Sequence, residues 1–198
     1  MKMCDNKKIK RCDWVGNNPL YIKYHDSEWG VPVFDDDKLF EFLVLETFQA
    51  GLSWLTILKK RENFIEAFEN YDYKKIAKYN NEKYEELLRN KGIIRNKLKI
   101  KATIFNAKEF IKIQDEFGSF SKYIWGFIDN KPIVNEFKTI DEIPTKTELS
   151  EKISKDLKKR GFKFVGPTII YAHMQATGMV NDHTIDCFRY DEINDLIE

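Results

Sequence analysis

The sequence predicts an all-α fold for this chain of 198 residues. Apolar residues recur at helical spacing through most of the chain. Capping residues precede these segments, and glycines follow several of them. Only residues 132–137 are expected to be extended, and that stretch is short. We therefore expect a bundle of roughly eight to ten short helices.

The N-terminal part begins with an aromatic segment and continues with helices. Residues 11–33 are rich in Trp and Tyr, and Asn, Pro and Gly residues are expected to divide them into loops and short turns. An aspartate is expected to cap a helix over residues 35–49, which Gly51 ends. Ser53 is expected to cap a second helix, which carries Trp54.

Helical periodicity continues to near the C-terminus. Further helices are expected over residues 62–68, 72–79, 81–90, 97–117, 119–127, 150–160 and 168–177. Pro167 suits the first helical position of the last of these, and Gly178 follows its end. No linker or internal repeat divides the chain, so residues 1–198 are expected to form one domain, with residues 1–10 and 191–198 as peripheral tails.

The composition predicts a cytoplasmic protein with reduced cysteines. No apolar run approaches the roughly 18 residues that a membrane span needs, and the charged first 13 residues do not form a secretory signal. Disulfides are rare in a reducing compartment. Cys12 and Cys187 are therefore expected to be metal ligands or inert thiols, while Cys4, in a charged stretch, is assigned no role.

The net charge of +1 does not by itself indicate nucleic-acid binding, so any basic surface must be local. One basic cluster contains Lys158, Lys159, Arg160 and Lys163, and another contains Arg95, Lys97 and Lys99. Each cluster is either a surface that contacts phosphates or the solvated face of a helix.

Four potential metal ligands lie near the two ends of the chain. Cys12 and His25 are near the start, and His183 and Cys187 are near the finish. Residues at i and i+4 share one face of a helix, so His183 and Cys187 are expected to reach the same ion. Two thiolates and two imidazoles suit a closed tetrahedral zinc site. The alternative is that they are packed core side chains, as expected for His173.

Glu46 lies in a helix that is apolar almost all round. Burying an ionised carboxylate costs several kcal/mol or raises its pKa, unless partners compensate. Glu46 therefore either faces solvent or a turn, or is an acceptor in a pocket. Trp14, Tyr24 and Trp54 either line a slot for a flat ring or pack in the core.

Leu52 follows Gly51 in the turn after this helix. An exposed leucine on such a turn can act as a wedge between stacked bases. The alternative is a hydrophobic contact that fixes the start of the next helix. The sequence pattern leaves both interpretations open.

Several ordered motifs resemble the 3-methyladenine DNA glycosylase I family, the zinc-containing branch of the helix-hairpin-helix glycosylases. The resemblance extends from Arg11 to Tyr190. The matching motifs are RCDW at 11–14, PLYIKYHDSEWGVP at 19–32, LETFQAGLSW at 45–54, KKREN at 59–63, GIIR at 92–95, LKKRGFKFVG at 157–166 and VNDH at 180–183.

The resemblance implies a helix-hairpin-helix glycosylase fold whose N- and C-termini are joined by a structural zinc ion. The implied metal ligands are Cys12, His25, His183 and Cys187. The implied base pocket contains Glu46 and Tyr24 as hydrogen-bonding residues, Trp54 as the stacking residue, and Trp14, Tyr21 and Trp29 as supporting residues. The implied DNA contacts are Gly51, Leu52, Arg160, Lys163 and Gly166.

The implied activity is that of a monomeric, monofunctional hydrolase. It would release 3-methyladenine from alkylated double-stranded DNA and have no lyase activity. Two departures from the wider superfamily stand out: residues 164–167 form a degenerate hairpin motif, and Asn181 replaces the usual catalytic aspartate. Two other classes remain open: a zinc-held nucleic-acid-binding module without activity, and a zinc hydrolase, which needs an open coordination position.

Overall fold

A computed structural model describes residues 9–196 and confirms the all-α class. Eleven α-helices lie within the described residues, slightly more than the sequence indicates. They are α1 (Pro19–Ser27), α2 (Asp36–Gln49), α3 (Trp54–Leu58), α4 (Arg61–Ala67), α5 (Tyr73–Ile76), α6 (Asn81–Arg89), α7 (Lys97–Phe117), α8 (Phe120–Trp125), α9 (Glu148–Lys159), α10 (Pro167–Ala176) and α11 (Phe188–Asp195). In this part of the chain no helix has the length and apolar character needed to cross a bilayer.

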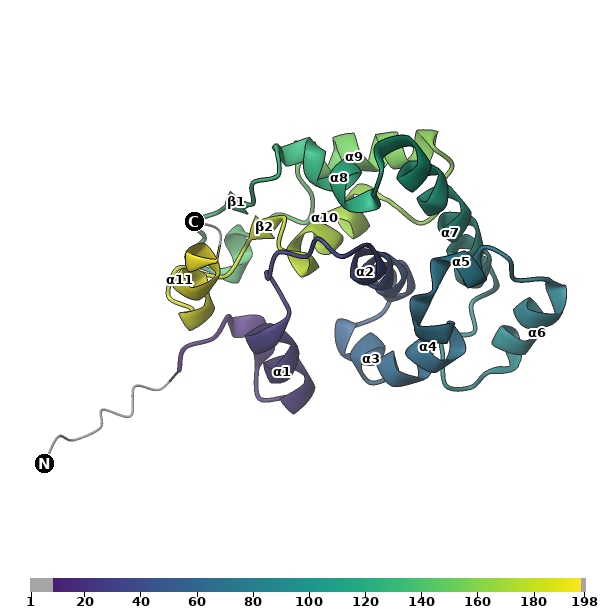
Figure 1. Ribbon diagram of the computed structural model, residues 1–198. Helices are drawn as coiled ribbons and strands as arrows, with labels where there is room; N and C mark the ends of the chain where they lie inside the picture. The colour runs from purple at the N-terminus through teal and green to yellow at the C-terminus, as the bar shows by residue number, and fades with distance from the viewer. Residues whose placement is uncertain (1–8, 197–198) are drawn as a thin grey trace, which may run out of the picture.

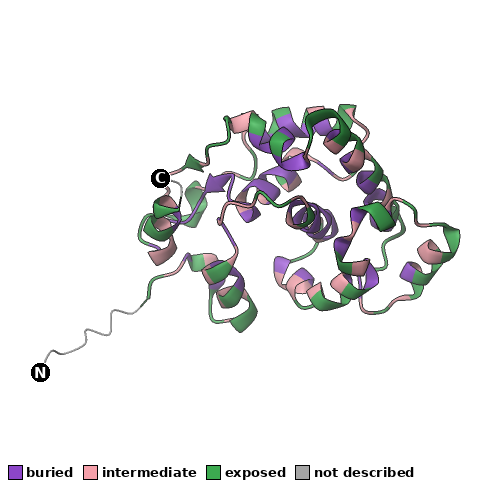
Figure 2. Ribbon diagram, in the orientation of Figure 1, coloured by how far each residue is buried: buried purple, intermediate pink, exposed green. Residues whose placement is uncertain are grey.

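Helix α2 is the centre of the fold (Figure 1). Every residue from Leu39 to Phe48 is buried, including two glutamates, and Figure 2 shows this helix as the most continuously buried element. It packs against α3, α7, α8 and α10. Because α2 has neighbours on several sides, its apolar residues are not confined to one face.

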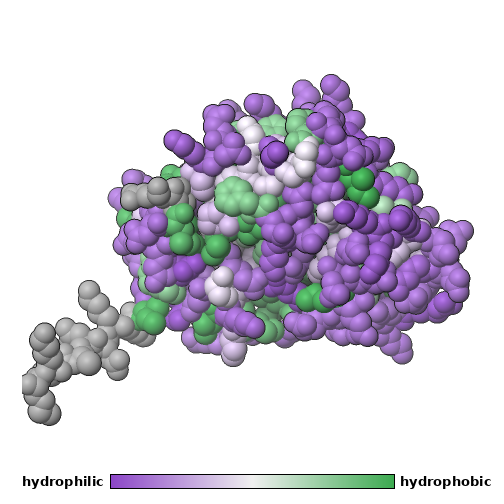
Figure 3. All heavy atoms as spheres, in the orientation of Figure 1, coloured by the Kyte–Doolittle hydropathy of each residue, from purple (hydrophilic) through white to green (hydrophobic). Residues whose placement is uncertain are grey.

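Hydrophilic residues cover most of the outer surface in the view of Figure 3.

The long helix α7 forms over residues 97–117 as expected, and Asn96 caps its first turn by accepting hydrogen bonds from two backbone N–H groups. The short extended segment is also confirmed: β1 (Ile133–Val134) pairs in parallel with β2 (Val180–Asn181).

The expectation of loops throughout residues 11–33 is wrong for its middle part. Asn18 accepts a hydrogen bond from the backbone N–H of Leu20 and caps α1, with Pro19 at the first helical position. The hydrophobic pattern does not reveal this helix, because Leu20 is exposed and His25, one of its two buried residues, is polar.

The two ends of the described chain meet, with α11 beside α1 (Figure 1). The backbone N–H of Phe188 donates to the carbonyl of Lys10 at 3.0 Å. Gly178, after α10, has a positive φ of 67°, and a Cβ there would lie 2.4 Å from the backbone of Val31 and Pro32. Glycine therefore permits the end of α10 to contact the segment after α1.

Candidate active site and metal centre

A cavity of about 230 Å³ opens between α1, α2, α3 and α10. This is below the size typical for drug-sized ligands, about 300–1,000 Å³, so it suits a small ring system. Its lining residues are Trp14, Tyr24, Trp29, Glu46, Gln49, Trp54, Ile140, Ile143, Ala172 and Gln175. The structure thus brings Glu46 together with four of the five aromatic residues that the sequence singled out.

The aromatic rings form the walls of this cavity. The ring centroids of Tyr24 and Trp54 are 5.2 Å apart, and those of Trp14 and Trp29 are 5.1 Å apart. Tyr21, the fifth aromatic residue, does not line the cavity. Its ring lies edge-on to Trp14 at 5.6 Å, and its hydroxyl accepts a hydrogen bond from the backbone N–H of Leu55 at 3.1 Å. Tyr21 therefore supports the wall and ties α1 to α3.

Glu46 is buried, and the solvent-facing alternative is wrong. Its side chain is 4% exposed, and Oε2 has no hydrogen-bond partner among the described residues. Burial raises the pKa of this carboxyl to about 8, because the charged form loses its hydration without gaining a partner. Nε1 of Trp54 is also buried, without a partner in the described part of the chain. Two unsatisfied polar groups at one cavity point to a ligand that would satisfy them.

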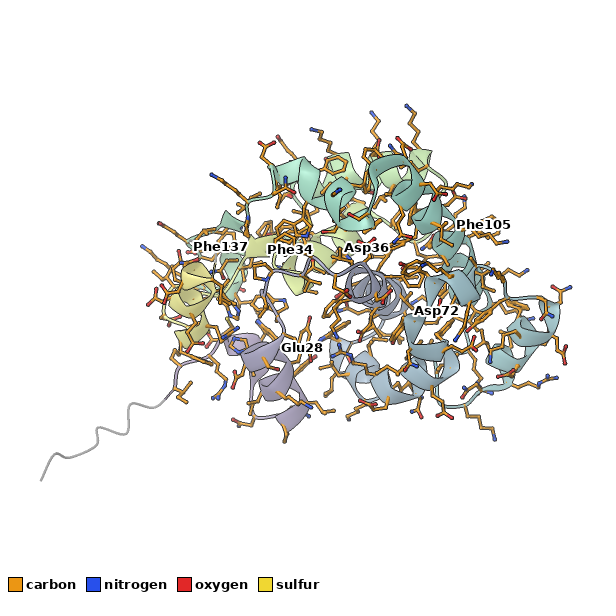
Figure 4. All side chains as sticks on the ribbon, viewed as in Figure 1. Glu28, Phe34, Asp36, Asp72, Phe105 and Phe137 are labelled. Atoms are coloured by element: carbon orange, nitrogen blue, oxygen red, sulfur yellow. The ribbon has the colours of Figure 1, made fainter. Side chains whose placement is uncertain are left out.

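Arg61 of α4 holds the helices that frame the cavity. Its guanidinium bonds Glu28, at the end of α1, and Glu41 of α2. Figure 4 shows Glu28 below α2, in the region between α1 and α3. Arg61 and Glu41 are mostly buried, so these ion pairs are not an exposed surface feature. They hold α1 against α2.

The turn after α2 exposes Leu52 to solvent. Gly51 has a positive φ of 79°, and the Leu52 side chain is 41% exposed. Lys99 is buried, so neither interpretation that the sequence left open for its basic cluster, phosphate contact or a solvated helix face, holds for this residue. Its ammonium group donates to the carbonyls of Phe48 at 2.8 Å and Ala50 at 2.5 Å, and caps the end of α2 directly below this turn.

The four potential metal ligands converge from opposite ends of the chain. Cys12, His25, His183 and Cys187 are all buried, and their ligand atoms lie within 4.8 Å of one another. Individual sulfur to nitrogen distances are 3.4, 3.5 and 3.6 Å. Standard zinc bond lengths at a tetrahedral angle give about 3.6 Å for such a pair. The residues therefore fit a tetrahedral metal ion with two sulfur and two nitrogen ligands.

The expected helical spacing of the last two ligands is wrong. Residues 182–187 form turns, and Cys187 lies at the N-cap position of α11. The backbone N–H of Cys187 bonds the carbonyl of Thr184, and this tight turn brings the thiol beside the imidazole of His183. A turn thus achieves the convergence that a helix was expected to provide.

Hydrogen bonds orient both imidazole rings toward the thiols. His25 uses Nδ1 to bond Asp26 at 2.8 Å, and Arg11 holds this aspartate in turn. His183 uses Nε2 to bond the carbonyl of Trp29 at 3.1 Å. In each ring the other nitrogen faces the cluster, which is the arrangement that outer hydrogen bonds impose on metal-binding histidines.

The hairpin between α9 and α10 contains Lys163 and Gly166. Asn106 of α7 fixes it by bonding both the N–H and the carbonyl of Lys163, at 2.8 and 2.9 Å. The side chain of Lys163 is exposed, and Gly166 caps α10. Arg160 does not join them. It bonds Asp156 and Glu116, and lies over two aromatic rings.

Five cavity residues were not singled out from the sequence: Gln49, Ile140, Ile143, Ala172 and Gln175. Ala172 and Gln175 are three apart on α10, so they share a face of that helix. Ile140 begins a short 3₁₀ helix, Ile140–Glu142, and Ile143 follows it; this element is too short for any periodicity to have placed them at the cavity.

Comparison with known proteins defines the class to which this helical fold and aromatic cavity belong, the base-removing glycosylases. The sequence profile of the methyladenine glycosylase family matches residues 14–190. DNA-3-methyladenine glycosylase 1 of Escherichia coli (strain K12) is 50% identical over 182 residues, which cover 92% of this chain and 97% of that protein. DNA-3-methyladenine glycosylase of Haemophilus influenzae is 50% identical over 177 residues, which cover 89% and 96%.

Solved structures agree. A crystal structure of 3-methyladenine DNA glycosylase I has a TM-score of 0.88 and 51% identity, covering 90% of this chain and 98% of that one. The Staphylococcus aureus enzyme, described for its 3-methyladenine recognition, has a TM-score of 0.87 and 36% identity, covering 90% and 95%. The chain therefore belongs to the methyladenine glycosylase family, and it is an enzyme of that family.

Proposed function

We propose that this protein extrudes 3-methyladenine from alkylated double-stranded DNA and hydrolyses its N-glycosidic bond. The observation that carries the proposal is the buried carboxyl of Glu46 in an aromatic cavity, whose Oε2 has no partner in residues 9–196. The two relatives of 50% identity carry the same activity in their names, and one structural relative was solved in complex with 3-methyladenine.

The chemistry needs little acid catalysis. Methylation at N3 makes the attached adenine cationic, so the base leaves as a neutral molecule with the electron pair of the broken bond. Water adds to the sugar carbon C1′ and loses a proton. A lyase reaction uses an amine nucleophile, and no lysine lines the cavity within residues 9–196. This supports a monofunctional hydrolase.

Charge provides the selectivity. A cationic base that lies against the rings of Tyr24 and Trp54 gains roughly 0.5–2 kcal/mol of cation–π attraction per ring. The positive charge also favours ionisation of Glu46, which then accepts a charge-assisted hydrogen bond from the base. Neutral adenine gains much less from either contact. Glu46 is thus the catalytic residue of the proposal, Tyr24 and Trp54 contact the base, and Trp14, Tyr21 and Trp29 support them.

DNA contacts follow from the exposed parts of the site. Leu52, presented by Gly51, fills the gap that the extruded base leaves in the duplex. The hairpin supplies backbone N–H groups near Gly166 and the side chain of Lys163 for phosphate contact. Arg160 is a weaker candidate, because two carboxylates already pair with it.

A zinc ion held by Cys12, His25, His183 and Cys187 would be structural, because four protein ligands leave no open position for water. When bound, it joins the N-terminal segment to the C-terminal one and stabilises the fold. We further propose that the protein is a cytoplasmic monomer in a helix-hairpin-helix glycosylase fold. A sedimentation measurement checks the monomer.

The decisive experiment is incubation of the protein with DNA treated with a methylating agent, followed by chromatography of the released bases. Release of 3-methyladenine without strand cleavage is the expected result. Glu46→Ala is expected to abolish release while the protein stays folded, as judged by circular dichroism. DNA binding without base release would instead support a non-catalytic binding module. Bound water in the spectrum of the cobalt-substituted protein would support a zinc hydrolase.

A further inference from the structure

Asp182 is a buried carboxylate that neither lines the cavity of Glu46 nor belongs to the group of four potential metal ligands. It is 1% exposed and precedes His183 of the metal cluster. Its Oδ2 accepts hydrogen bonds from the hydroxyl of Tyr171 at 2.6 Å and from Nε2 of Gln175 at 2.8 Å, and its Oδ1 accepts one from Nδ2 of Asn135 at 2.7 Å. Three donors surround it, so it is fully engaged within the protein.

This network determines which end of the Gln175 amide faces the cavity. An ionised carboxylate only accepts hydrogen bonds, so the amide nitrogen of Gln175 must turn toward Asp182. The opposite end, Oε1, has no donor within hydrogen-bonding distance among residues 9–196, while the side chain lines the cavity. The main chain of Gln175 is also fixed, because its carbonyl accepts from the backbone N–H of Gly30 at 3.0 Å.

We propose that Asp182 is a positioning residue that presents Oε1 of Gln175 to the bound base as an acceptor for its amino group. This inference rests on the proposed function and adds a rule of specificity to it. A purine with an amino group at C6 offers a donor to Oε1, whereas a purine with an oxo group there offers a second acceptor. Asp182 and Gln175 together therefore favour 6-amino over 6-oxo purines, because the acceptor Oε1 is held in a fixed position where only the amino group can donate to it.

The segment over the cavity depends on the same carboxylate. Asn135 follows β1, and the chain continues from it to Ile140 and Ile143, which line the cavity. Asp182 thus bonds both Asn135, which precedes the segment of Ile140 and Ile143, and Gln175, a polar residue that lines the cavity. Neither contact requires Asp182 itself to touch the base.

A similar network elsewhere provides a matched control. Nε2 of Gln114 donates to Oδ2 of Asp36 at 2.6 Å and contacts the hydroxyl of Tyr73 at 2.9 Å, so the same three residue types meet there. Asp36 lies in the first turn of α2 (Figure 4), and none of these three residues lines the cavity that holds Glu46. Asp36→Asn therefore changes a carboxylate of comparable role without changing the cavity.

The test is the ratio of affinities for 3-methyladenine and for its 6-oxo counterpart, 3-methylhypoxanthine, measured by quenching of tryptophan fluorescence. In Asp182→Asn the new amide can donate to Oε1, which turns the Gln175 amide so that its nitrogen faces the cavity. We expect the preference for the amino purine to fall about tenfold or more, as for a mismatched buried hydrogen bond. Asp36→Asn is expected to lower the melting temperature and leave the ratio unchanged.

Gln175→Ala leaves the carboxylate and the metal cluster in place and is expected to lower the same ratio. Asp182→Asn should then add nothing in the Gln175→Ala background. An unchanged ratio in Gln175→Ala overturns the proposal, and so does a further change of the ratio in the double variant. Failure of the wild-type protein to release 3-methyladenine would instead overturn the proposed function, which keeps the two failures distinct.

Discussion

His183 and Trp29 share one hydrogen bond that links the metal cluster to the aromatic cavity. Nε2 of the imidazole bonds the carbonyl of Trp29 at 3.1 Å, and the two rings lie edge to face with centroids 4.6 Å apart. Gly30 follows directly, and a Cβ there would lie 3.0 Å from the same Nε2. One side of the histidine ring therefore faces the potential metal, and the other fixes a wall of the cavity.

Removal of the metal is expected to destabilise the protein and loosen the cavity. Cys187→Ala should abolish binding of zinc, measured by elemental analysis, and lower the melting temperature by about 10 °C or more, because a link across most of the chain is lost. Affinity for 3-methyladenine should fall as Trp29 loses its support. Cys4→Ser, which removes the third thiol, is the control and should retain one zinc per chain.

Glu46 is expected to make stability depend on pH. Its pKa rises from an ordinary 4.5 to about 8 in the folded protein. Between these values the folded state keeps a proton that the unfolded state has lost, so stability falls as pH rises from about 4.5 to 8, by at most about 5 kcal/mol. Urea unfolding of wild type and Glu46→Gln at pH 5 and pH 8.5 measures this, because the variant lacks that dependence.

The matched control is Glu66→Gln, which changes an exposed glutamate of α4. It should follow the wild type at both pH values. A difference between wild type and Glu46→Gln that stays constant with pH would contradict a raised pKa at this position.

Leu52→Ala is expected to separate base binding from base extrusion. Leu52 does not line the aromatic cavity of Tyr24 and Trp54, although it lines a neighbouring cavity that Glu46 also reaches, so affinity for free 3-methyladenine should remain nearly unchanged. Excision from duplex DNA should fall about tenfold or more, because nothing fills the gap left by the base. Leu98→Ala, at a position 67% exposed on α7, is the control. Equal loss in both variants would argue against a wedge.

Lys99→Met is expected to disturb the turn that carries Leu52, because Lys99 bonds the carbonyls that precede this turn. The ammonium group of Lys99 holds two carbonyls at the end of α2, and its removal leaves them unsatisfied. We expect a loss of about 1–3 kcal/mol in unfolding free energy and slower excision from duplex DNA. Lys101→Met, two residues further on the exposed side of α7, should change neither quantity. The measurements are urea unfolding and single-turnover excision.

Lys163 and Arg160 are expected to behave differently although both are basic residues near the hairpin. Lys163→Ala should reduce the slope of log affinity for DNA against log salt by about one. Arg160→Ala should leave that slope nearly unchanged and lower the melting temperature, because Arg160 pairs with Asp156 and Glu116. A reduced slope in Arg160→Ala would place its side chain at the phosphates after all.

The sequence by itself determined the helices whose signals are local. Asn96 and Gly118 bound α7 because a capping side chain and a left-handed glycine act on neighbouring residues. The same holds for Pro167 at the start of α10. Glu46 was also recognisable from the sequence, because burying a carboxylate in an apolar helix costs free energy wherever that helix packs.

Only the tertiary structure decided which side chains meet. It turned Lys99 inward and paired Arg160 with two carboxylates. It also placed the Gln175 side chain at the cavity of Glu46, with its amide nitrogen bonded to Asp182. Such choices depend on contacts between residues far apart in the chain, such as Asp182 with Asn135. Local propensity carries no information on these contacts, because their energies exist only once the helices have packed.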